Sequence, residues 1–183
     1  MRDVGEAFAS DPDRLALAEI PRESAGDTAV NVKATLTPDD LARACADAMW
    51  KDDDASKGLG MEIVHIRPGE ATLTMTVKPN MANGYGTAHG GFIFTLADSA
   101  FAFACNSRNA RTVAAQCDIA FIRPGKVGDR LIATAREISR TGRSGIYDVR
   151  VTVGDTAIAE MRGYSRTIGG TWVPSAEAGA KPE

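Results

Sequence analysis

The residues best suited to chemistry lie between Asn83 and Asp98, where a glycine-rich loop leads into a strongly apolar segment. The loop ends in His89-Gly90-Gly91, and backbone N–H groups at the start of a helix favour negative charge. Because the two glycines carry no side chain, a ligand carbonyl can approach the main chain closely there. A developing oxyanion would suit this place. Taken alone, however, Asn83 followed by glycine is typical of an ordinary turn, and a lone histidine is usually structural.

Asp98 is the one acidic residue in the apolar run from Phe92 to Cys105. Burying an ionised carboxylate without a partner is costly, so its presence needs an explanation. One interpretation is structural, with Thr95, Ser99 or backbone groups hydrogen-bonded to the carboxylate. The other is functional, with Asp98 acting as a general base or nucleophile in a dry cleft.

The spacing along this helix indicates a site shared between two chains. Gly90 and Asp98 are separated by eight residues, a rise of about 12 Å at about 1.5 Å per residue. Asp98 is therefore poorly placed to act on a carbonyl held at its own helix N-terminus. A twofold partner whose helix runs antiparallel alongside would bring its Asp98 there, which predicts two equivalent sites in a homodimer.

The histidines and cysteines predict no metal centre. His65 and His89 are the only histidines, so a site of three histidines is impossible, and the close spacing of a mixed cysteine and histidine site is absent. His65 lies in a predicted strand and is expected to be structural. Cys45, Cys105 and Cys117 form no CxxC pair, which favours reduced thiols. A Cys105 nucleophile is discounted because apolar surroundings raise the pKa of a thiol.

The pattern of polarity predicts one sheet wrapped around one helix. Apolar and polar residues alternate in six runs, at 61–66, 71–78, 113–121, 131–138, 147–153 and 157–161. No helices alternate with these runs, so the sheet is expected to be mostly antiparallel. The segment from Gly91 to Ser107 is helical in pattern and apolar on nearly every side, so it must be buried all round. A single sheet covers such a helix by curling around it, which is the α+β architecture of the hotdog fold, and the side left uncovered points to a partner subunit.

The ends of the chain are predicted to be separate from this domain. Residues 1–36 are expected to form a loosely ordered N-terminal extension, 37–170 the hotdog domain and 171–183 a C-terminal tail. Thr37 can cap a helix whose first turn holds a proline and two aspartates. This helix is expected to end within the acidic run 51–54, followed by a connection.

Charge is distributed unevenly, although the net charge is only −3. Residues 1–60 carry 7 basic and 13 acidic residues, whereas residues 105–166 carry 11 basic and 6 acidic residues. The basic segment suggests an anionic ligand, while the weak net charge argues against a general nucleic-acid binder. Neither a secretory signal nor a bilayer-spanning segment is visible, so we expect a soluble cytoplasmic protein without a membrane or nucleic-acid partner.

The loop and helix resemble those of a known family. The spacing Asn83-x5-His89-Gly90-Gly91-x6-Asp98 is similar to that of the PaaI family, which are hotdog acyl-CoA thioesterases associated with phenylacetate degradation. The resemblance covers about residues 50–170 and includes four further segments, 96–107, 121–129, 145–148 and 162–166.

This resemblance implies how the roles are divided. The aspartate matching Asp98 acts as nucleophile or general base from one subunit, and the residues matching Asn83 and His89-Gly90 come from the other. The glycine N–H polarises the thioester carbonyl. The resemblance also implies homodimers that commonly pair into homotetramers, and it offers no role for the N-terminal extension. No cofactor is expected beyond the coenzyme A that the substrate itself carries.

We therefore expect hydrolysis of an aryl-acetyl or medium-chain acyl-CoA, with Gly90 and Gly91 contacting the substrate through the backbone. Asn83 would orient the carbonyl or the attacking group, and His89 would position the loop or the thioester. Five basic residues are candidates to attract the coenzyme A phosphates, with Arg140 and Arg143 the chosen contacts: Arg123, Lys126, Arg130, Arg140 and Arg143.

Two other functions remain open from the sequence. One is a hotdog hydratase or dehydratase, although neither histidine lies five residues after an aspartate as in the MaoC type. The other is a non-catalytic module that binds acyl-CoA.

Overall fold

The structure is a computed structural model, and it describes residues 36–174. The predicted N-terminal extension, residues 1–36, lies outside the described residues except for its last position. Among the helices between residues 36 and 174, none combines the length and the hydropathy that a bilayer-spanning helix needs. The elements follow in the order α1 (Pro38–Trp50), α2 (Asp54–Leu59), β1 (Glu62–Arg67), β2 (Glu70–Thr76), the short 3-10 helix η1 (Pro79–Met81), α3 (Gly90–Asn106), β3 (Thr112–Phe121), β4 (Arg130–Thr141), β5 (Ser144–Val153) and β6 (Thr156–Thr167).

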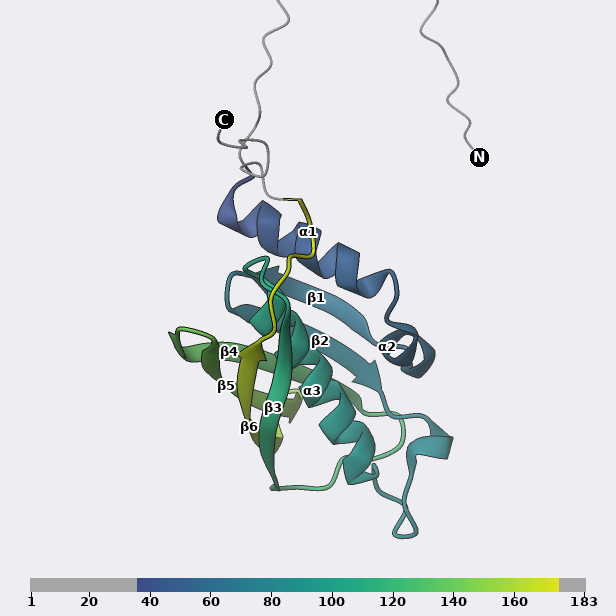
Figure 1. Ribbon diagram of the computed structural model, residues 1–183. Helices are drawn as coiled ribbons and strands as arrows, with labels where there is room; N and C mark the ends of the chain where they lie inside the picture. Colours follow the sequence, from purple (N-terminus) through teal and green to yellow (C-terminus); the bar gives the residue numbers. More distant parts are fainter. Residues whose placement is uncertain (1–35, 175–183) are drawn as a thin grey trace, which may run out of the picture. The chain divides into compact units, whose positions relative to one another are not determined.

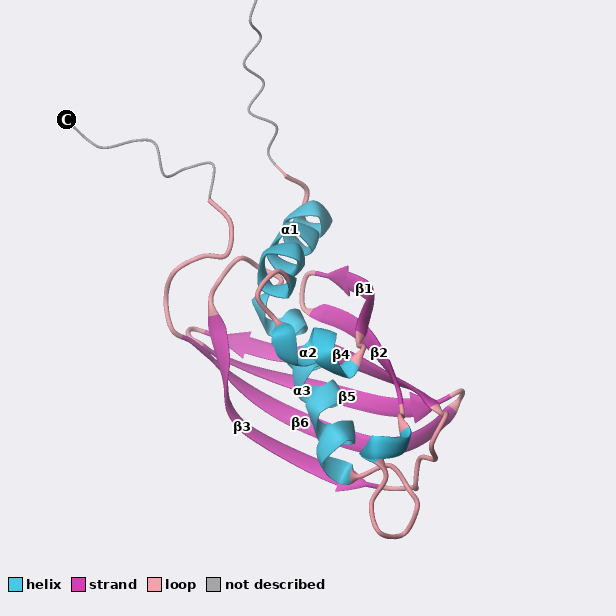
Figure 2. Ribbon diagram, turned by 90° about the vertical axis from the view of Figure 1, so that its right-hand side faces the viewer, coloured by secondary structure: helices cyan, strands magenta, loops and turns pink. Residues whose placement is uncertain are grey.

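The six strands form one sheet in the order β1-β2-β4-β5-β6-β3, and every neighbouring pair is antiparallel. The sheet curls around α3 (Figures 1 and 2), which is the predicted hotdog architecture. All six predicted runs are confirmed as strands, and the two residues Gly154-Asp155 connect β5 to β6 as a tight hairpin.

The core lies between α3 and the sheet. The buried apolar residues of α3 are Ile93, Leu96, Ala97, Ala100, Phe101, Phe103, Ala104 and Cys105. Each large apolar side chain buried this way stabilises the fold by about 1.5–3 kcal/mol. A Cβ on Gly163 of β6 would lie 2.9 Å from the Phe101 ring. This glycine therefore allows the helix to lie close against the sheet.

One side of α3 is not covered within a single chain. Phe94, Asp98 and Ala102 follow one another at helical spacing, and all three are only half-buried. The prediction of a helix buried on every side is therefore wrong for one chain, because the sheet packs on the other sides only. This stripe agrees with the expectation that one sheet cannot enclose the helix.

The two helices before the sheet differ in how well the sequence predicts them. As expected, Thr37 caps α1, and its hydroxyl oxygen accepts the Asp40 N–H at 3.2 Å. The sequence predicts that the acidic run leads into a connection, but Asp53 caps a second helix by accepting the Ser56 N–H at 3.0 Å. The six residues of α2 are too few to produce a helical pattern in the sequence, and Gly60 ends the helix at a φ of 75°.

The chain after β6 is bound to the loop that follows α3. The Asn109 side-chain oxygen accepts the Trp172 N–H at 2.9 Å, and the Trp172 indole donates to Asn106 at 2.7 Å. The Arg111 guanidinium lies over the indole ring, 4.8 Å from its centre. The predicted tail, residues 171–183, therefore starts with residues that are bonded to the folded body. Contacts between side chains so distant in the sequence leave no local pattern.

Candidate active site

The start of α3 retains one backbone donor for a ligand. His89 is the N-cap, and its ring atom Nδ1 accepts the Gly91 N–H at 2.9 Å. The N–H groups of Phe92 and Ile93 both turn back to the His89 carbonyl oxygen, at 3.0 and 3.4 Å. No acceptor within residues 36–174 takes the Gly90 N–H. This donor is thus left over at the positive end of the helix.

The same cap fixes which ring nitrogen of His89 is the acceptor. A backbone N–H can only donate, so Nδ1 offers its lone pair to Gly91, and Nε2 is the ring nitrogen left free to donate. Gly91, predicted to contact the substrate through its backbone, has its N–H engaged by this cap. Within one chain the glycine pair therefore offers one backbone donor where the sequence predicts two.

Asn83 organises the loop between residues 83 and 87. Its side-chain oxygen accepts the Tyr85 N–H at 2.9 Å, the Thr87 N–H at 3.2 Å and the Thr87 hydroxyl at 3.2 Å. The amide NH2 group has no acceptor among the described residues. Asn83 is consequently a turn residue through its oxygen and remains a potential donor through its nitrogen.

Asn83 and Gly90 line the same cavity, which has a volume of about 330 Å³. Ile93 of α3 and Phe121 at the end of β3 form part of its apolar wall. A Cβ on Gly90 would lie 2.9 Å from the Phe121 ring. A glycine is therefore needed for the ring and the helix start to lie so close.

Asp98 lies two turns further along α3 and does not line this cavity. Its only side-chain hydrogen-bond partner among residues 36–174 is the Cys117 thiol on β3, with Sγ 4.0 Å from Oδ1. The two candidate hydroxyl partners are engaged elsewhere. Thr95 donates to a backbone carbonyl one turn back at 2.7 Å, and Ser99 pairs with a serine of α2 at 3.0 Å. The structural interpretation of Asp98 therefore lacks its expected partners.

Burial raises the pKa of the Asp98 carboxyl, and no charged side chain of the described chain opposes this shift. Burial and, second, the Asp98 charge raise the pKa of Cys105 to about 12 and that of Cys117 to about 11. Both thiols are protonated at neutral pH, which agrees with discounting Cys105 as a nucleophile. The half-buried carboxylate, with its raised pKa, is the better candidate for a base or nucleophile.

Arg140 and Arg143 lie at the opposite end of the sheet from Gly90. Phe121, beside Gly90, is the last residue of β3. The turn that contains Arg143 instead lies beside the last residues of β6, which pair with the first residues of β3. The Arg143 guanidinium donates from Nε to the Thr167 carbonyl at 2.9 Å. Within one chain, the structure does not bring these two arginines together with the other predicted site residues.

Arg123 is the basic residue that lies at the cavity with Asn83 and Gly90. Its Nη1 donates to the Ala157 carbonyl at 3.1 Å, which fixes the side chain beside β6. The sequence suggests Arg123 only as one of several candidate phosphate contacts, and it places Phe121 in a segment of the family resemblance without indicating that the residue lies at the site. One sequence signal could have indicated both residues. The strand that follows α3 must run back along the helix, so the residues at its end are expected to lie near the start of α3.

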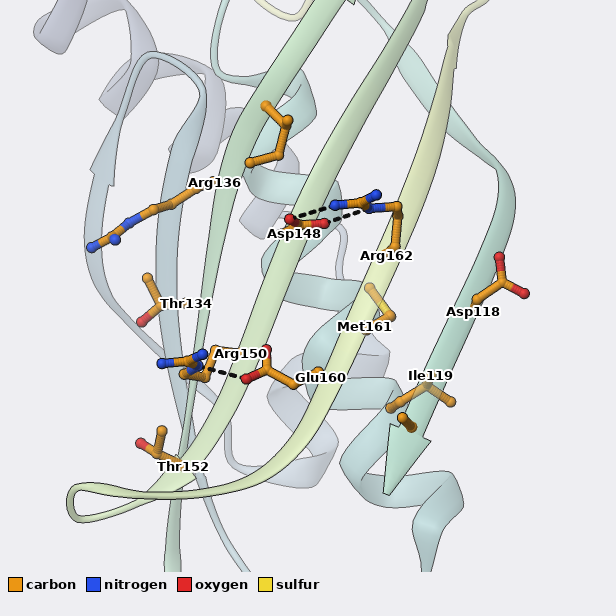
Figure 3. A pocket seen from close by; sticks show the side chains of 12 residues that line it. Asp118, Ile119, Thr134, Arg136, Asp148, Arg150, Thr152, Glu160, Met161 and Arg162 are labelled. Atoms are coloured by element: carbon orange, nitrogen blue, oxygen red, sulfur yellow. Dashed lines mark hydrogen bonds and ion pairs between the residues drawn. The ribbon is translucent and has the colours of Figure 1, made fainter. Parts of the chain in front are cut away.

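A larger hollow of about 870 Å³ lies on the face of the sheet turned away from α3 (Figure 3). Four of its six charged side chains are paired across the strands, Arg150 with Glu160 and Arg162 with Asp148, each at 2.7 Å. None of the predicted site residues lines it. The smaller cavity at the start of α3 is therefore the better candidate for the active site.

No group of three His, Cys, Asp or Glu side chains within residues 36–174 is arranged to hold a metal ion. His65, predicted to be structural, lies in β1. Within one chain the cavity brings together the Gly90 backbone donor and the Asn83 amide, His89 caps the same helix start, and the Asp98 carboxylate lies two turns further along α3.

Strand β3 forms one edge of the sheet and is ten residues long. Most of its side chains are exposed, among them Val113 at 44% and Phe121 at 53%. A long exposed edge presents unpaired backbone N–H and C=O groups to another strand. This edge is therefore a candidate surface for a second copy of the chain.

Comparison with known proteins places this geometry in a family. Residues 85–160 match the family model of the thioesterase superfamily. The chain is 45% identical over 127 residues to the acyl-coenzyme A thioesterase PaaI of Escherichia coli (strain K12), covering 69% of this chain and 91% of that protein. The structure of the E. coli PaaI protein from the phenylacetic acid degradation operon matches with a TM-score of 0.73 at 42% identity, over 74% of this chain and 99% of that one. A Streptococcus mutans protein, solved bound to acetyl CoA, matches with a TM-score of 0.59 at 28% identity, over 61% of this chain and 90% of that one.

The fold and these matches define the class as hotdog thioesterases. Within that class, the chain belongs to the PaaI-type acyl-CoA thioesterase family. The resemblance predicted from the loop and helix is thus confirmed. The segment matched by the family model includes His89, Gly90 and Asp98 and begins two residues after Asn83. The role of each individual residue stays a prediction.

Proposed function

We propose that this protein hydrolyses the thioester of an acyl-CoA that carries an aryl-acetyl or medium-chain acyl group. The observation that carries the proposal is the half-buried Asp98 carboxylate, which has no charged partner among residues 36–174, on a helix whose first N–H, that of Gly90, has no acceptor in the same range. The 45% identical relative is named as an acyl-coenzyme A thioesterase, and its structure is described as coming from the phenylacetic acid degradation operon. These names support the thioester and the aryl-acetyl class.

In the proposed site, the Gly90 N–H binds the carbonyl oxygen of the thioester. The helix dipole and this donor stabilise the negative charge that develops on the oxygen during attack. The Asn83 NH2 group orients the carbonyl or the attacking group. His89 keeps the first turn of the helix in place through its bond to Gly91, and so positions the loop.

Asp98 of a second copy supplies the attacking chemistry. It either attacks the carbonyl carbon, forming an anhydride that water then cleaves, or takes a proton from an attacking water molecule. In both cases the carbon–sulfur bond breaks, and the products are the free acid and the thiol of coenzyme A. Its surroundings favour either role, because burial keeps the carboxylate more basic than in water.

The shared site requires a homodimer, and we propose that the β3 edges pair in it. The exposed edge of β3 and the uncovered stripe of α3 support this arrangement. The rise of about 12 Å between Gly90 and Asp98 supports it too, since one chain alone separates the two groups. Pairing of such dimers into a homotetramer is a further part of the proposal, drawn from the family resemblance, and a cytoplasmic location is another, drawn from the cysteine pattern and the signal-free sequence.

The coenzyme A part of the substrate needs cationic contacts for its phosphates. Arg123, at the cavity, is the candidate within the same chain as Gly90. Arg140 and Arg143 remain candidates from a neighbouring copy, because within one chain they lie at the far end of the sheet. No cofactor beyond the coenzyme A of the substrate is proposed.

The test is a panel of short aliphatic, long aliphatic and aryl-acetyl CoA thioesters, followed by release of free thiol. We expect turnover with aryl-acetyl or medium-chain substrates. A hydratase or dehydratase would change the acyl group without releasing thiol, and a binding module would bind the thioesters without turnover. Either result would reject the proposed hydrolysis.

The shared site is tested separately by mixing inactive Asp98→Asn and inactive Asn83→Ala subunits. Verified mixed dimers should regain part of the activity, because one of their two sites then combines an intact Asp98 with an intact Asn83. Mixed dimers without any activity would place the site within one chain.

A further inference from the structure

Asp98 has few groups around it that could control its carboxylate. Among the described residues, the titratable groups whose pKa is raised by the Asp98 charge are two thiols, Cys105 on its own helix and Cys117 on β3. No charged group from α1, α2 or any strand contributes to its pKa shift. The groups that can orient the carboxylate are therefore thiols, which are weak hydrogen-bond donors.

The two thiols differ in where they donate. The Cys105 thiol is engaged along its own helix, with Sγ 3.4 Å from the Ala102 carbonyl oxygen. The Cys117 thiol instead faces Asp98 across the gap between β3 and α3, at 4.0 Å from Oδ1. Its chain neighbours Gln116 and Asp118 are exposed and hydrogen-bond to each other at 3.1 Å. Cys117 is thus the one side-chain donor available to the carboxylate in the described chain.

We propose that Cys117 is a positioning residue for Asp98. Its thiol holds Oδ1 through a weak hydrogen bond, and this leaves Oδ2 directed at the substrate or at water. The inference rests on the proposed function, since it gives a task to the carboxylate only if Asp98 takes part in the reaction.

The weakness of the thiol as a donor is central to this role. A serine hydroxyl is a stronger donor than a thiol, and because its oxygen lies closer to Cβ than sulfur does, the Asp98 carboxylate must turn towards β3 to accept from it. A stronger bond favours the ionised form and lowers the carboxyl pKa, which makes the group a poorer base. A side chain without a donor would leave the carboxylate unheld and still less willing to ionise. The thiol lies between these two cases, so it orients the carboxylate while leaving it basic.

The test compares kcat for phenylacetyl-CoA against pH in the full chain and in the Cys117→Ser and Cys117→Ala variants. Activity falls on the acid side as Asp98 becomes protonated. We expect this acid limb to move by about half a pH unit, downward in Cys117→Ser and upward in Cys117→Ala. We also expect kcat on the plateau to fall several-fold in both, with KM nearly unchanged.

Cys105→Ala is the matched control, because it removes a neighbouring thiol that donates to a backbone carbonyl. Its acid limb should coincide with that of the parent. A role of Cys117 in packing alone predicts that the acid limbs of both Cys117 variants coincide with the parent as well, and this result would overturn the inference. Thermal unfolding of each variant shows that the comparison is made on folded protein.

Failure of this inference is distinguishable from failure of the proposed function. If Asp98→Asn keeps its kcat, the proposed role of Asp98 is wrong and the inference falls with it. If Asp98→Asn is inactive while the Cys117 variants keep the parent's acid limb, only the inference is wrong. Titration of the Asp98 carboxyl by carbon-13 NMR gives the same two pKa shifts independently of activity, and absence of both shifts would also overturn it.

Discussion

An asparagine lies near each end of α3, and the two differ in how much of their hydrogen-bonding capacity the fold uses. At the C-terminal end, Asn106 is 1% exposed, and both sides of its amide are engaged. Its nitrogen donates to the carbonyls of Ala102 and Thr112, and its oxygen accepts from Thr112 and Trp172 at 2.9 and 2.7 Å. At the N-terminal end, Asn83 uses its oxygen for the loop and leaves its nitrogen without an acceptor in the described chain.

The neighbouring backbone groups repeat this contrast. At the C-terminal end of α3, called the closed end below, the Ser107 hydroxyl donates to the Ala104 carbonyl and accepts the Gly69 N–H, both at 2.7 Å. At the N-terminal end, called the open end below, the Gly90 N–H has no acceptor within residues 36–174. Residue type alone therefore does not distinguish a structural asparagine from one that can bind a ligand. The distinction lies in whether a donor or acceptor of the side chain is left without a partner after folding.

The largest expected effect is that of the Asp98 carboxylate, which is proposed to act on a substrate bound at the open end of α3 in a second copy. Asp98→Asn should lower kcat by about 10²–10⁴-fold, because it removes the base or nucleophile while keeping the shape of the side chain. Steady-state thiol release from an accepted acyl-CoA measures the loss. A kcat within a few-fold of the parent would show that the open end works without this carboxylate.

The open end itself is tested by Asn83→Asp. A carboxylate can keep the three bonds that the Asn83 oxygen accepts from the loop, but it has no NH2 to donate. We expect kcat/KM to fall by about 10²-fold, the loss typical of one missing donor at a reacting carbonyl. Circular dichroism and thermal unfolding should resemble those of the parent. Loss of structure together with activity would mean that Asn83 serves the loop alone.

The closed end should respond in stability and not in chemistry. Asn106→Ala leaves buried N–H and C=O groups of the loop and the Trp172 indole unpaired, which should lower the free energy of unfolding by about 2–3 kcal/mol. At temperatures well below its midpoint, kcat should match the parent. The check is chemical denaturation beside the thiol-release assay, and a large loss of kcat in the folded variant would contradict the division between the two ends.

The smallest effect concerns Asp98 and stability. Burial raises its pKa in the folded chain above 3.8, the ordinary value of an aspartate, so protonation is favoured by folding. The stabilisation this provides is complete below about pH 3.8 and is lost as pH rises through the folded pKa. Asp98→Asn should therefore be slightly more stable than the parent at pH 7, with the difference vanishing towards pH 3.8. Thermal midpoints across this range measure it, and a less stable variant at pH 7 would point to a favourable partner for the carboxylate.

Local chemistry explains what the sequence predicts well. The alternating runs, the Thr37 cap and the glycine loop leading into an apolar helix are features of a few neighbouring residues, so they are visible in the sequence. The family follows from the same loop and helix. Within the candidate site, the places of Gly90 at the helix start and of Asp98 two turns further on were predicted in this way.

What the sequence does not predict depends on how distant segments meet. Phe121 covers Gly90 because β3 ends beside the start of α3, and the same arrangement puts Arg143 at the other end. The His89 cap takes the Gly91 N–H through a bond whose existence depends on the loop conformation. The Cys117 thiol meets Asp98 only because one strand edge lies along the helix.

Strand β3 carries both Phe121, which lies over Gly90, and Cys117, which faces Asp98. A second copy that pairs its own strand with this edge would fix the positions of both side chains, and dissociation on dilution would free them. Turnover per chain should then rise with protein concentration until association is complete, so activity would depend on how much of the protein has accumulated.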